Sequence, residues 1–188
     1  MSCRRSCSPW HTLAVALAAV LAATSAHAAL LSYTLPQLIE KSRHVVTGEV
    51  TEVRCYRAPF HDLGEVTFTD VTIRVDGVLK GSAVKQVTVQ VLGGEIGTAV
   101  ERCPDSPRFT KGEKVLVFLR EYHGALWTTG WLQGKYTLSD DGSTVKGVQT
   151  LPISRDTPLE SLKAEVKLRE GSSVSPSGGR TLDEGGAR

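Results

Sequence analysis

The stretch from Arg43 to Tyr56 constrains the fold most strongly, because its apolar residues change face partway along one extended run. Val46 and Val50 fall on one parity, and side chains that alternate in this way point to one face of a β-strand. Val53 and Cys55 fall on the other parity. A change of phase inside one strand needs an extra residue or a sharp bend, so the run predicts a long strand that bends halfway.

Gly48 and the Thr51-Glu52 step are the positions where a β-bulge fits this run, because glycine inside a strand often marks a bulge or a close backbone approach. A bent strand can take part in two sheets at once, as it does where a small Greek-key barrel closes. We therefore expect this run to be the first strand of such a barrel.

Later apolar runs continue the β pattern. Glu65–Leu79 predicts a second long strand that changes parity near Asp70, and two bent neighbours fit a curled sheet better than a flat sandwich. Lys114–Arg120 contains five consecutive apolar residues, which is typical of a strand covered on both faces. Gly93–Lys111 is predicted to be irregular. Short strands are expected at 86–92, 125–131, 135–138 and 144–148, with a hairpin turn at Asp140-Asp141-Gly142.

Two helices are predicted to flank the strands. Thr34–Ser42 has a threonine at the N-cap, a proline in the first turn and Gln37 placed to complete a capping box. Residues 157–170 begin with Thr157-Pro158 and carry an apolar stripe that suits packing on the barrel. Residues 171–188 are serine, glycine, proline and charge, which predicts a disordered tail.

The first 28 residues have the pattern of an export signal. Arg4 and Arg5 precede an apolar core at Leu13–Ala23, and Ala26-His27-Ala28 matches the small-x-small cleavage site. The apolar core is too short to span a bilayer as a permanent helix. We expect cleavage after Ala28 and an exported chain, either periplasmic or extracellular, with no membrane span.

Removal of this signal leaves a chain of balanced charge. All 20 acidic residues follow Ala28, and loss of Arg4 and Arg5 reduces the 22 basic residues to the same number. The mature net charge is therefore about zero, so no basic excess favours a nucleic-acid or anionic-membrane partner.

Two cysteines, Cys55 and Cys103, remain after the predicted cleavage. An exported chain with two cysteines favours one disulfide, and closing so long a loop is worth roughly 4 kcal/mol on the chain-entropy model. A metal site is the competing interpretation, but it needs more ligands at close spacing, such as Cys-x-x-Cys. Two free thiols are the third alternative.

Several fragments of the chain, in their order and spacing, resemble the TIMP-like or netrin-module (NTR-like) OB-fold domains of exported bacterial proteins. The matching fragments lie at Val45–Val50, Val78–Gly81, Leu92–Gly94, Phe109–Leu119 and Gln133–Tyr136. The resemblance covers about Thr34 to Val148. It implies a five-stranded OB-like Greek-key barrel with flanking helices.

The animal members of that group inhibit metalloproteinases through an N-terminal Cys-x-Cys, whose first cysteine chelates the zinc of the enzyme. Here the predicted mature chain starts Ala29-Leu30-Leu31-Ser32, and no cysteine precedes Cys55 after cleavage. The chelating mechanism is therefore not available to this chain. Inhibition of a secreted metalloprotease by other contacts stays open as an alternative that rests on fold analogy.

Motifs for catalysis are absent from the sequence. No Gly-x-Ser-x-Gly, Ser-x-x-Lys set or His-Glu-x-x-His occurs, and the glycines at Gly93-Gly94 suit a turn better than a phosphate site. His61-Asp62 with His123 would form a metal site or an acid–base pair if the fold brought them together. Their spacing does not place them on one element, so surface positions are the alternative, as they are for His44. We therefore predict no catalytic, metal or cofactor residues.

Aromatic residues give a better indication of function. Tyr56 and Phe60 lie with His61 in a connection, Tyr56–Gly64, that contains proline and glycine. Large aromatics are hard to bury in such a loop, so we predict a partner-binding patch at Tyr56, Phe60 and His61. The alternative is that Phe60 folds back over the barrel end. Trp127 and Trp131 share parity on one predicted strand and are expected to pack in the core or at the barrel mouth.

Taken together, the sequence predicts a mainly β protein: a signal peptide at 1–28, an OB-like barrel domain at 29–156, a helix at 157–170 and a tail at 171–188. The predicted function is a secreted or periplasmic non-catalytic binding domain that recognises a protein partner. The alternatives are an inhibitor or accessory of a secreted metalloprotease, and an enzyme built on His61, Asp62 and His123.

Overall fold

The structure is a computed structural model, and it describes residues 32–61, 64–146, 153 and 157–172. The chain divides into two units, Met1–Leu31 and Ser32–Arg188, and all of the described residues belong to the second. Its long elements are α2 (Leu35–Lys41), β1 (His44–Pro59), β2 (Glu65–Lys80), β3 (Gln86–Leu92), β6 (Lys114–Tyr122) and α3 (Leu159–Ser172). The short elements are β4 (Gly94–Ile96), β5 (Ala99–Glu101), β7 (Ala125–Thr128), the 3₁₀-helix η3 (Trp131–Gly134), β8 (Lys135–Leu138), β9 (Thr144–Lys146) and β10 (Thr157–Pro158).

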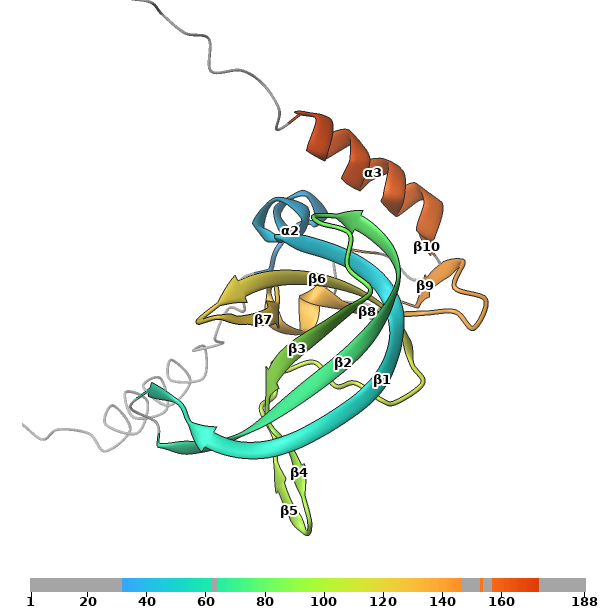
Figure 1. Ribbon diagram of the computed structural model, residues 1–188. Coiled ribbons are helices and arrows are strands. Elements are labelled where there is room, and N and C mark those ends of the chain that lie inside the picture. The colour runs from blue at the N-terminus through green and yellow to red at the C-terminus, as the bar shows by residue number, and fades with distance from the viewer. Residues whose placement is uncertain (1–31, 62–63, 147–152, 154–156, 173–188) are drawn as a thin grey trace, which may run out of the picture. The chain divides into compact units, whose positions relative to one another are not determined.

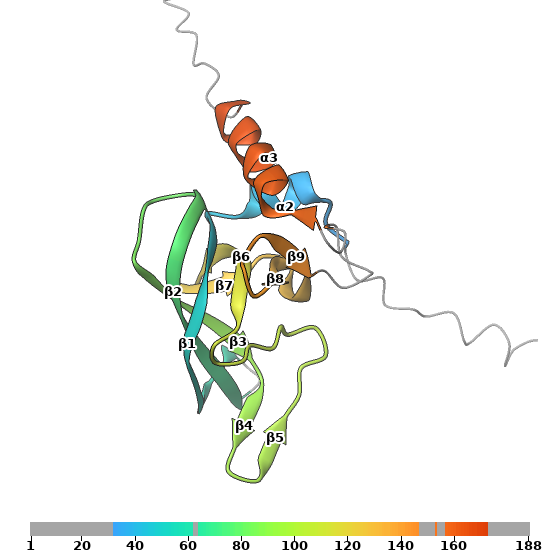
Figure 2. The same ribbon diagram turned by 90° about the vertical axis from the view of Figure 1, so that its right-hand side faces the viewer.

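The fold is mainly β, and its eight-stranded sheet partly closes into a ring (Figure 1). Pairing runs from β1 to β2, β3, β7 and β6, and β6 pairs again with β1. Every contact in this ring is antiparallel except β3 with β7, which are parallel at Val89 and Leu126. The other strands of the sheet, β8, β9 and β10, continue outward from β6. The β4–β5 hairpin extends on the side opposite α2 and α3 (Figure 2).

β1 bends where its sequence predicts. Its register with β2 shifts at three steps, including Thr47/Gly48 and Val50/Glu52. At Gly48 a Cβ atom would lie 2.1 Å from the carbonyl oxygen of Arg74 and 2.8 Å from Ile73 Cγ2, so only glycine allows this approach. The register shift between Val50 and Glu52 inserts one extra residue into β1. Val53 and Cys55 therefore stay on the face of Val50 although their parity differs, which explains the change of parity.

The parity change predicted at Asp70 in β2 is wrong. The β1–β2 register runs unbroken from Glu52 to Pro59, and the β2–β3 register runs unbroken from Phe68 to Arg74. Thr67, Phe68 and Thr69 are all buried, because both faces of β2 are covered at this point. When both faces of a strand are covered, apolar residues occur at odd and at even positions. In the sequence this looks the same as a change of parity caused by a bulge.

Two buried clusters occupy the two faces of β6. Val115, Val117 and Leu119 pack inside the ring with valines of β1 and β3. Leu116 and Phe118 point to the other cluster, which joins the ring to the helices. The helical residues of that cluster are Leu38, Ile39, Leu159, Leu162 and Val166. The five-residue apolar run is thus a strand covered on both faces, as predicted.

Most element boundaries match the prediction, and the differences have local causes. α2 carries the predicted capping box from Thr34 to Gln37. α3 begins at Leu159 rather than at Pro158, because Thr157 and Pro158 pair with β9 as strand β10, and it continues past Gly171 to Ser172. Leu159, Leu162 and Val166 form its buried apolar stripe, whereas Leu168 is 67% exposed and does not belong to it.

Three predicted loop or strand segments are corrected. Tyr56–Pro59 is the end of β1 and not a connection, and Pro59 is tolerated because it is the last residue of the strand. The predicted strand at 125–131 stops at Thr128, where η3 follows after a turn. The long irregular segment contains the β4–β5 hairpin.

Other sequence predictions fall outside the described residues: the signal at 1–28, Asp62, the strand end at 147–148 and the tail from residue 173. Among the helices that the structure describes, none has the length and apolarity needed to cross a membrane.

Candidate functional site

Eight aromatic and histidine rings form one connected surface, here called the aromatic face. They come from the far end of the β1–β2 hairpin, the β6–β7 turn and η3. Its members are Tyr56, Phe60, His61, Phe68, Tyr122, His123, Trp127 and Trp131. Ring centroids of neighbours lie between 4.2 and 6.3 Å apart. All of these pairs except Tyr122–His123 fall in the range of favourable aromatic contacts.

The aromatic face has a buried base and an exposed outer layer. Phe68 and Trp127 are 4% and 7% exposed and form the base. Phe60 is half-buried, with its ring centroid 5.5 Å from that of Phe68 and 6.2 Å from that of Trp127. Tyr122 and Trp131 are 41% and 37% exposed, and the outer layer includes both histidines. The base therefore holds in place rings that water can reach.

The exposed rings stand on strained turns. Within the described residues, His61, His123 and Trp131 are the three non-glycine residues with positive φ, at 48°, 49° and 57°. His123 precedes Gly124 in a two-residue hairpin turn that needs positive φ at both positions, where Asn-Gly is the usual choice. Trp131 follows Gly130 in the left-handed region, which is unusual for so bulky a residue.

The fold brings His61 and His123 together, with ring centroids 4.9 Å apart. The sequence could not predict this contact, because the two residues lie on separate turns. The described residues contain no group of three His, Cys, Asp or Glu side chains able to hold a metal ion, and Asp62 is not among the described residues. His44 lies at the start of β1 and is half-buried, whereas the sequence suggested a surface position for it.

Tyr56 anchors the aromatic face to the sheet. Its hydroxyl donates to Asp70 at 3.2 Å and accepts from Gln90 Nε2 at 2.6 Å, and Arg54 pairs with Asp70 at 3.2 Å. Burial raises the pKa of the Tyr56 hydroxyl above its usual value, and the negative charge of Asp70 acts in the same direction. Tyr56 is thus neutral and fixed, with its ring 5.8 Å from Phe68.

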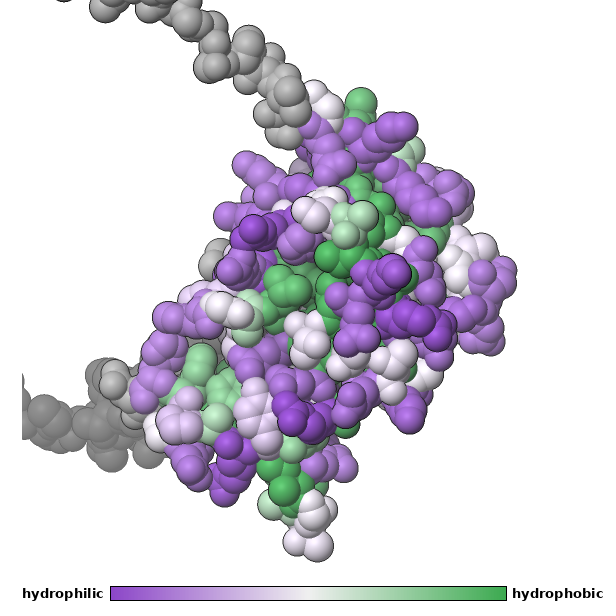
Figure 3. Space-filling model, in the orientation of Figure 1, coloured by the Kyte–Doolittle hydropathy of each residue, from purple (hydrophilic) through white to green (hydrophobic). Residues whose placement is uncertain are grey.

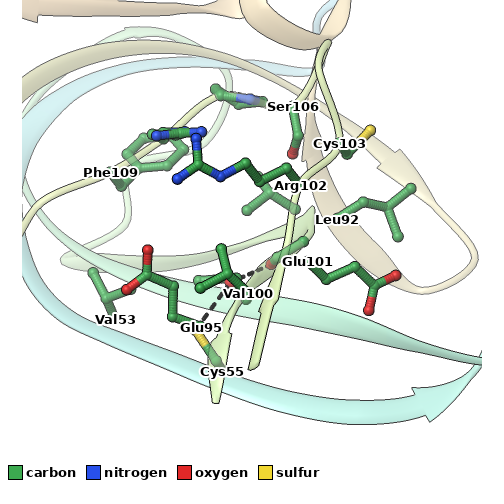
Figure 4. Close-up of a pocket in the computed structure, with 16 residues that line it drawn as sticks. Val53, Cys55, Leu92, Glu95, Val100, Glu101, Arg102, Cys103, Ser106 and Phe109 are labelled. Atoms are coloured by element: carbon green, nitrogen blue, oxygen red, sulfur yellow. Dashed lines mark hydrogen bonds between the residues drawn. The ribbon is translucent and has the colours of Figure 1, made fainter. Parts of the chain in front are cut away.

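A pocket of about 330 Å³ lies on the opposite face of the same strands (Figure 4). Its walls come from the outer half of β1, from Thr69 of β2, from β3, from the β4–β5 hairpin and from the loop at 102–109. The apolar lining residues are Val53, Val91, Leu92, Val100, Pro107 and Phe109. The hairpin beside it carries apolar surface at its tip (Figure 3), where Ile96 and Val100 are 38% and 50% exposed.

Gly93 and Gly94 shape this pocket through close backbone approaches. A Cβ on Gly93 would lie 2.8 Å from the carbonyl oxygen of Glu101, and one on Gly94 would lie 2.7 Å from Cys55 Sγ. Both have positive φ, at 87° and 151°. The two glycines let the hairpin turn out of β3 close to its neighbours, which fits the predicted turn.

Cys55 and Cys103 both line the pocket, and both are free thiols in the structure. Cys55 Sγ lies 3.2 Å from the hydroxyl of Thr69. The predicted disulfide is therefore not formed here, although the two cysteines do share one site. The bond itself stays a prediction, which a thiol count on the protein purified without reductant would test.

The predicted binding residues Tyr56, Phe60 and His61 thus lie together. The sequence left open whether Phe60 is exposed for binding or folds back over the barrel end, and in the structure its side chain is half-buried. Sequence analysis missed Phe68, Tyr122 and the contact of Trp131 with Trp127, whose ring centroids are 6.3 Å apart. The available signal for Tyr122 was Gly124 two residues later, because glycine suits the second position of a tight hairpin turn. Comparison of the chain with protein-family models and with characterised proteins finds no match.

Proposed function

We propose that this chain is an exported, non-catalytic binding domain that recognises a protein partner through the aromatic face. The observation that carries the proposal is the strain at His61, His123 and Trp131, which are all three of the described non-glycine residues with positive φ. Each such residue costs of order 1 kcal/mol or more, and strained residues cluster at binding sites. Glycine or asparagine would relieve that strain, whereas these bulky rings extend the exposed layer.

Exposure of large rings also supports a protein-binding surface. Exposed aromatic side chains lower solubility, and interfaces are where proteins accept that cost. Buried aromatic anchors surrounded by half-exposed rings match the arrangement of interface hot spots. The indole Nε1 of Trp127, in the base, is buried without a hydrogen-bond partner. A mature net charge near zero leaves apolar and aromatic contact as the main source of affinity.

The proposed scaffold is an OB-like five-stranded barrel formed by β1, β2, β3, β6 and β7. In sequence order these are strands one to five, and they pair in the order 1-2-3-5-4-1. That order supports the resemblance to TIMP-like and netrin-module domains, in which the connection after the first strand borders the binding face. The aromatic face includes this connection at Phe60 and His61.

The experiment is capture of the partner with paired variants. The mature chain, immobilised, is exposed to the exported proteins of the producing cells, and the bound protein is identified by mass spectrometry. Phe60→Ala and Trp131→Ala should each weaken binding by about thirtyfold, which corresponds to about 2 kcal/mol for loss of an aromatic anchor. Val84→Ala is the matched control, because Val84 is 37% exposed like Trp131 but lies in the β2–β3 turn.

Equal capture by wild type, Phe60→Ala and Trp131→Ala would contradict the proposal. A captured metalloprotease that the mature chain inhibits at stoichiometric ratio would identify the partner class as the alternative that the resemblance implies. Turnover of a substrate that is lost in His61→Ala would instead favour an enzyme.

A further inference from the structure

The pocket behind β1 is separate from the aromatic face, because neighbouring residues of β1 point to opposite sides of the sheet. Val53 and Cys55 line the pocket, whereas Tyr56 contacts the aromatic face. A volume of about 330 Å³ lies within the range of small-molecule sites. The pocket is thus a second candidate site on the same half of the strand.

Ser106 gives the pocket a hydrogen-bonding group without a partner. Ser106 is 7% exposed, and its Oγ is one of four buried side-chain polar atoms in the described residues that have no hydrogen-bond partner. Of these four residues, only Ser106 lines the pocket, and Figure 4 shows its hydroxyl pointing into it from the loop. Leaving a buried hydroxyl without a hydrogen-bond partner is costly, so the position of Ser106 calls for an explanation.

The loop holds Ser106 in place without using its side chain. The backbone N–H of Ser106 donates to the carbonyl of Cys103 at 3.1 Å, which closes a turn with Pro104 at its second position. The backbone N–H of Leu132 donates to the carbonyl of Asp105 at 3.0 Å and ties the turn to η3. The hydroxyl is therefore fixed near its position and left free to donate.

The charged residues that line the pocket lie on two different sides of it. Arg102 lies on the same side of the pocket as Ser106, whereas Glu95 lies on the opposite side near Val53 (Figure 4). Arg108 also lines the pocket. The carboxylate of Glu101 already accepts the backbone N–H of Thr67 at 3.0 Å. The loop side thus offers hydrogen-bond donors and positive charge above an apolar wall.

We propose that this pocket binds a carboxylate attached to an apolar chain. The carboxylate accepts from Ser106 Oγ and from the guanidinium of Arg102, whose planar fork suits carboxylate geometry. The apolar chain lies against Val91, Leu92 and Phe109. Two sources share this chemistry: a small aliphatic acid, and the carboxyl terminus of a peptide that ends in an apolar residue.

Nuclear magnetic resonance titration of the reduced mature protein tests the proposal with hexanoate, hexanol and hexylammonium. Hexanoate should shift the backbone amide signals of the pocket, and it should bind at least tenfold more tightly than either control, because a hydrogen bond to a charged group is worth that factor. A peptide ending in leucine is compared with its carboxyl-amidated form. Preference for the free carboxyl terminus over both the amide and hexanoate would identify a peptide as the source.

Variants separate binding from packing. Ser106→Ala and Arg102→Gln should each weaken binding of the preferred carboxylate by about tenfold, whereas Lys85→Gln, at an exposed position outside the lining, should not change it. The proposal is overturned if neither hexanoate nor the free peptide binds, if hexanol or hexylammonium binds as tightly, or if either Ser106→Ala or Arg102→Gln binds the carboxylate like wild type. Thermal unfolding of each variant establishes that it is folded.

Discussion

The two halves of β1 differ in strand pairing, in burial and in what their side chains contact. From Val45 to Glu49 the strand pairs with both β2 and β6, and Val45, Val46 and Val50 are fully buried. Beyond Glu52 it pairs with β2 alone. There one face lines the pocket and the other contacts the aromatic face.

This difference shows how one strand serves both scaffold and site. The first half is enclosed by neighbours on two sides, so any change there disturbs packing. The second half lies beyond the closed part of the ring and has a paired strand on one edge only. Its side chains reach the pocket on one face and the aromatic face on the other. The bulge at Val50/Glu52 separates the two halves and sets which residues face the pocket.

Gly48, at the bend of β1, is the position where a substitution should destabilise the fold most. Gly48→Ala should destabilise the protein by about 3 kcal/mol or more, because its Cβ would lie 2.1 Å from the backbone oxygen of Arg74 and neither strand can move freely. Urea unfolding measures this change. Gly171→Ala is the control, since a Cβ there has nothing within 4 Å and helical alanine is favoured over glycine. A loss below about 1 kcal/mol at Gly48 would mean that the bend tolerates a side chain.

A matched pair of substitutions compares the halves directly. Val50→Ala should cost about 2 kcal/mol, because the Val50 side chain is fully buried inside the ring. Val53→Ala should cost less than about 0.5 kcal/mol, because Val53 is 37% exposed at the pocket. The same unfolding measurement serves for both variants. Equal costs would remove the distinction between scaffold half and site half.

The smallest effect concerns alkaline pH and two tyrosines. Burial raises the pKa of Tyr136, in the helix-side core, well above its usual value of 10, and it raises the pKa of Tyr56 as well. A raised folded-state pKa of this kind adds stability that is present below about pH 10 and is lost as the pH rises through the folded value. Tyr136→Phe should therefore reduce the alkaline loss of stability more than Tyr56→Phe does.

Unfolding free energies measured at a series of pH values between about pH 8 and pH 12 check this order. Phe substitutions at both positions keep the ring and remove only the ionisable hydroxyl. A larger change in Tyr56→Phe would place the more strongly buried phenol at the aromatic face, contrary to the structure.

Local patterns predicted the elements that depend on neighbours in sequence. The bulge at Gly48 follows from parity and from one glycine, and the capping box from Thr34 to Gln37 follows from residue spacing. β3 begins and ends at the predicted residues, because one of its faces is buried and the valines alternate without interruption. The five apolar residues of β6 predicted burial on both faces.

Long-range packing explains what the sequence could not predict. Phe68 is buried on the outer face of β2 by Phe60 and Trp127, which lie on other elements, so its burial appeared as a change of parity at Asp70. His61 and His123 meet only because two turns converge. The pocket needs three strands, a hairpin and a loop at once, and no local pattern encodes that combination.

Site-specific photo-crosslinking tests whether the aromatic face is the surface that binds the partner. A photoreactive residue replaces Tyr122, which is 41% exposed on the aromatic face, or Val84, which is 37% exposed in the β2–β3 turn. With the exported proteins of the producing cells, the probe at 122 should give one defined adduct that excess wild type removes and excess Trp131→Ala does not. The probe at 84 should give none that behaves in this way. If Trp131→Ala competes as well as wild type, or both probes give the same competed adduct, the aromatic face is not the binding surface.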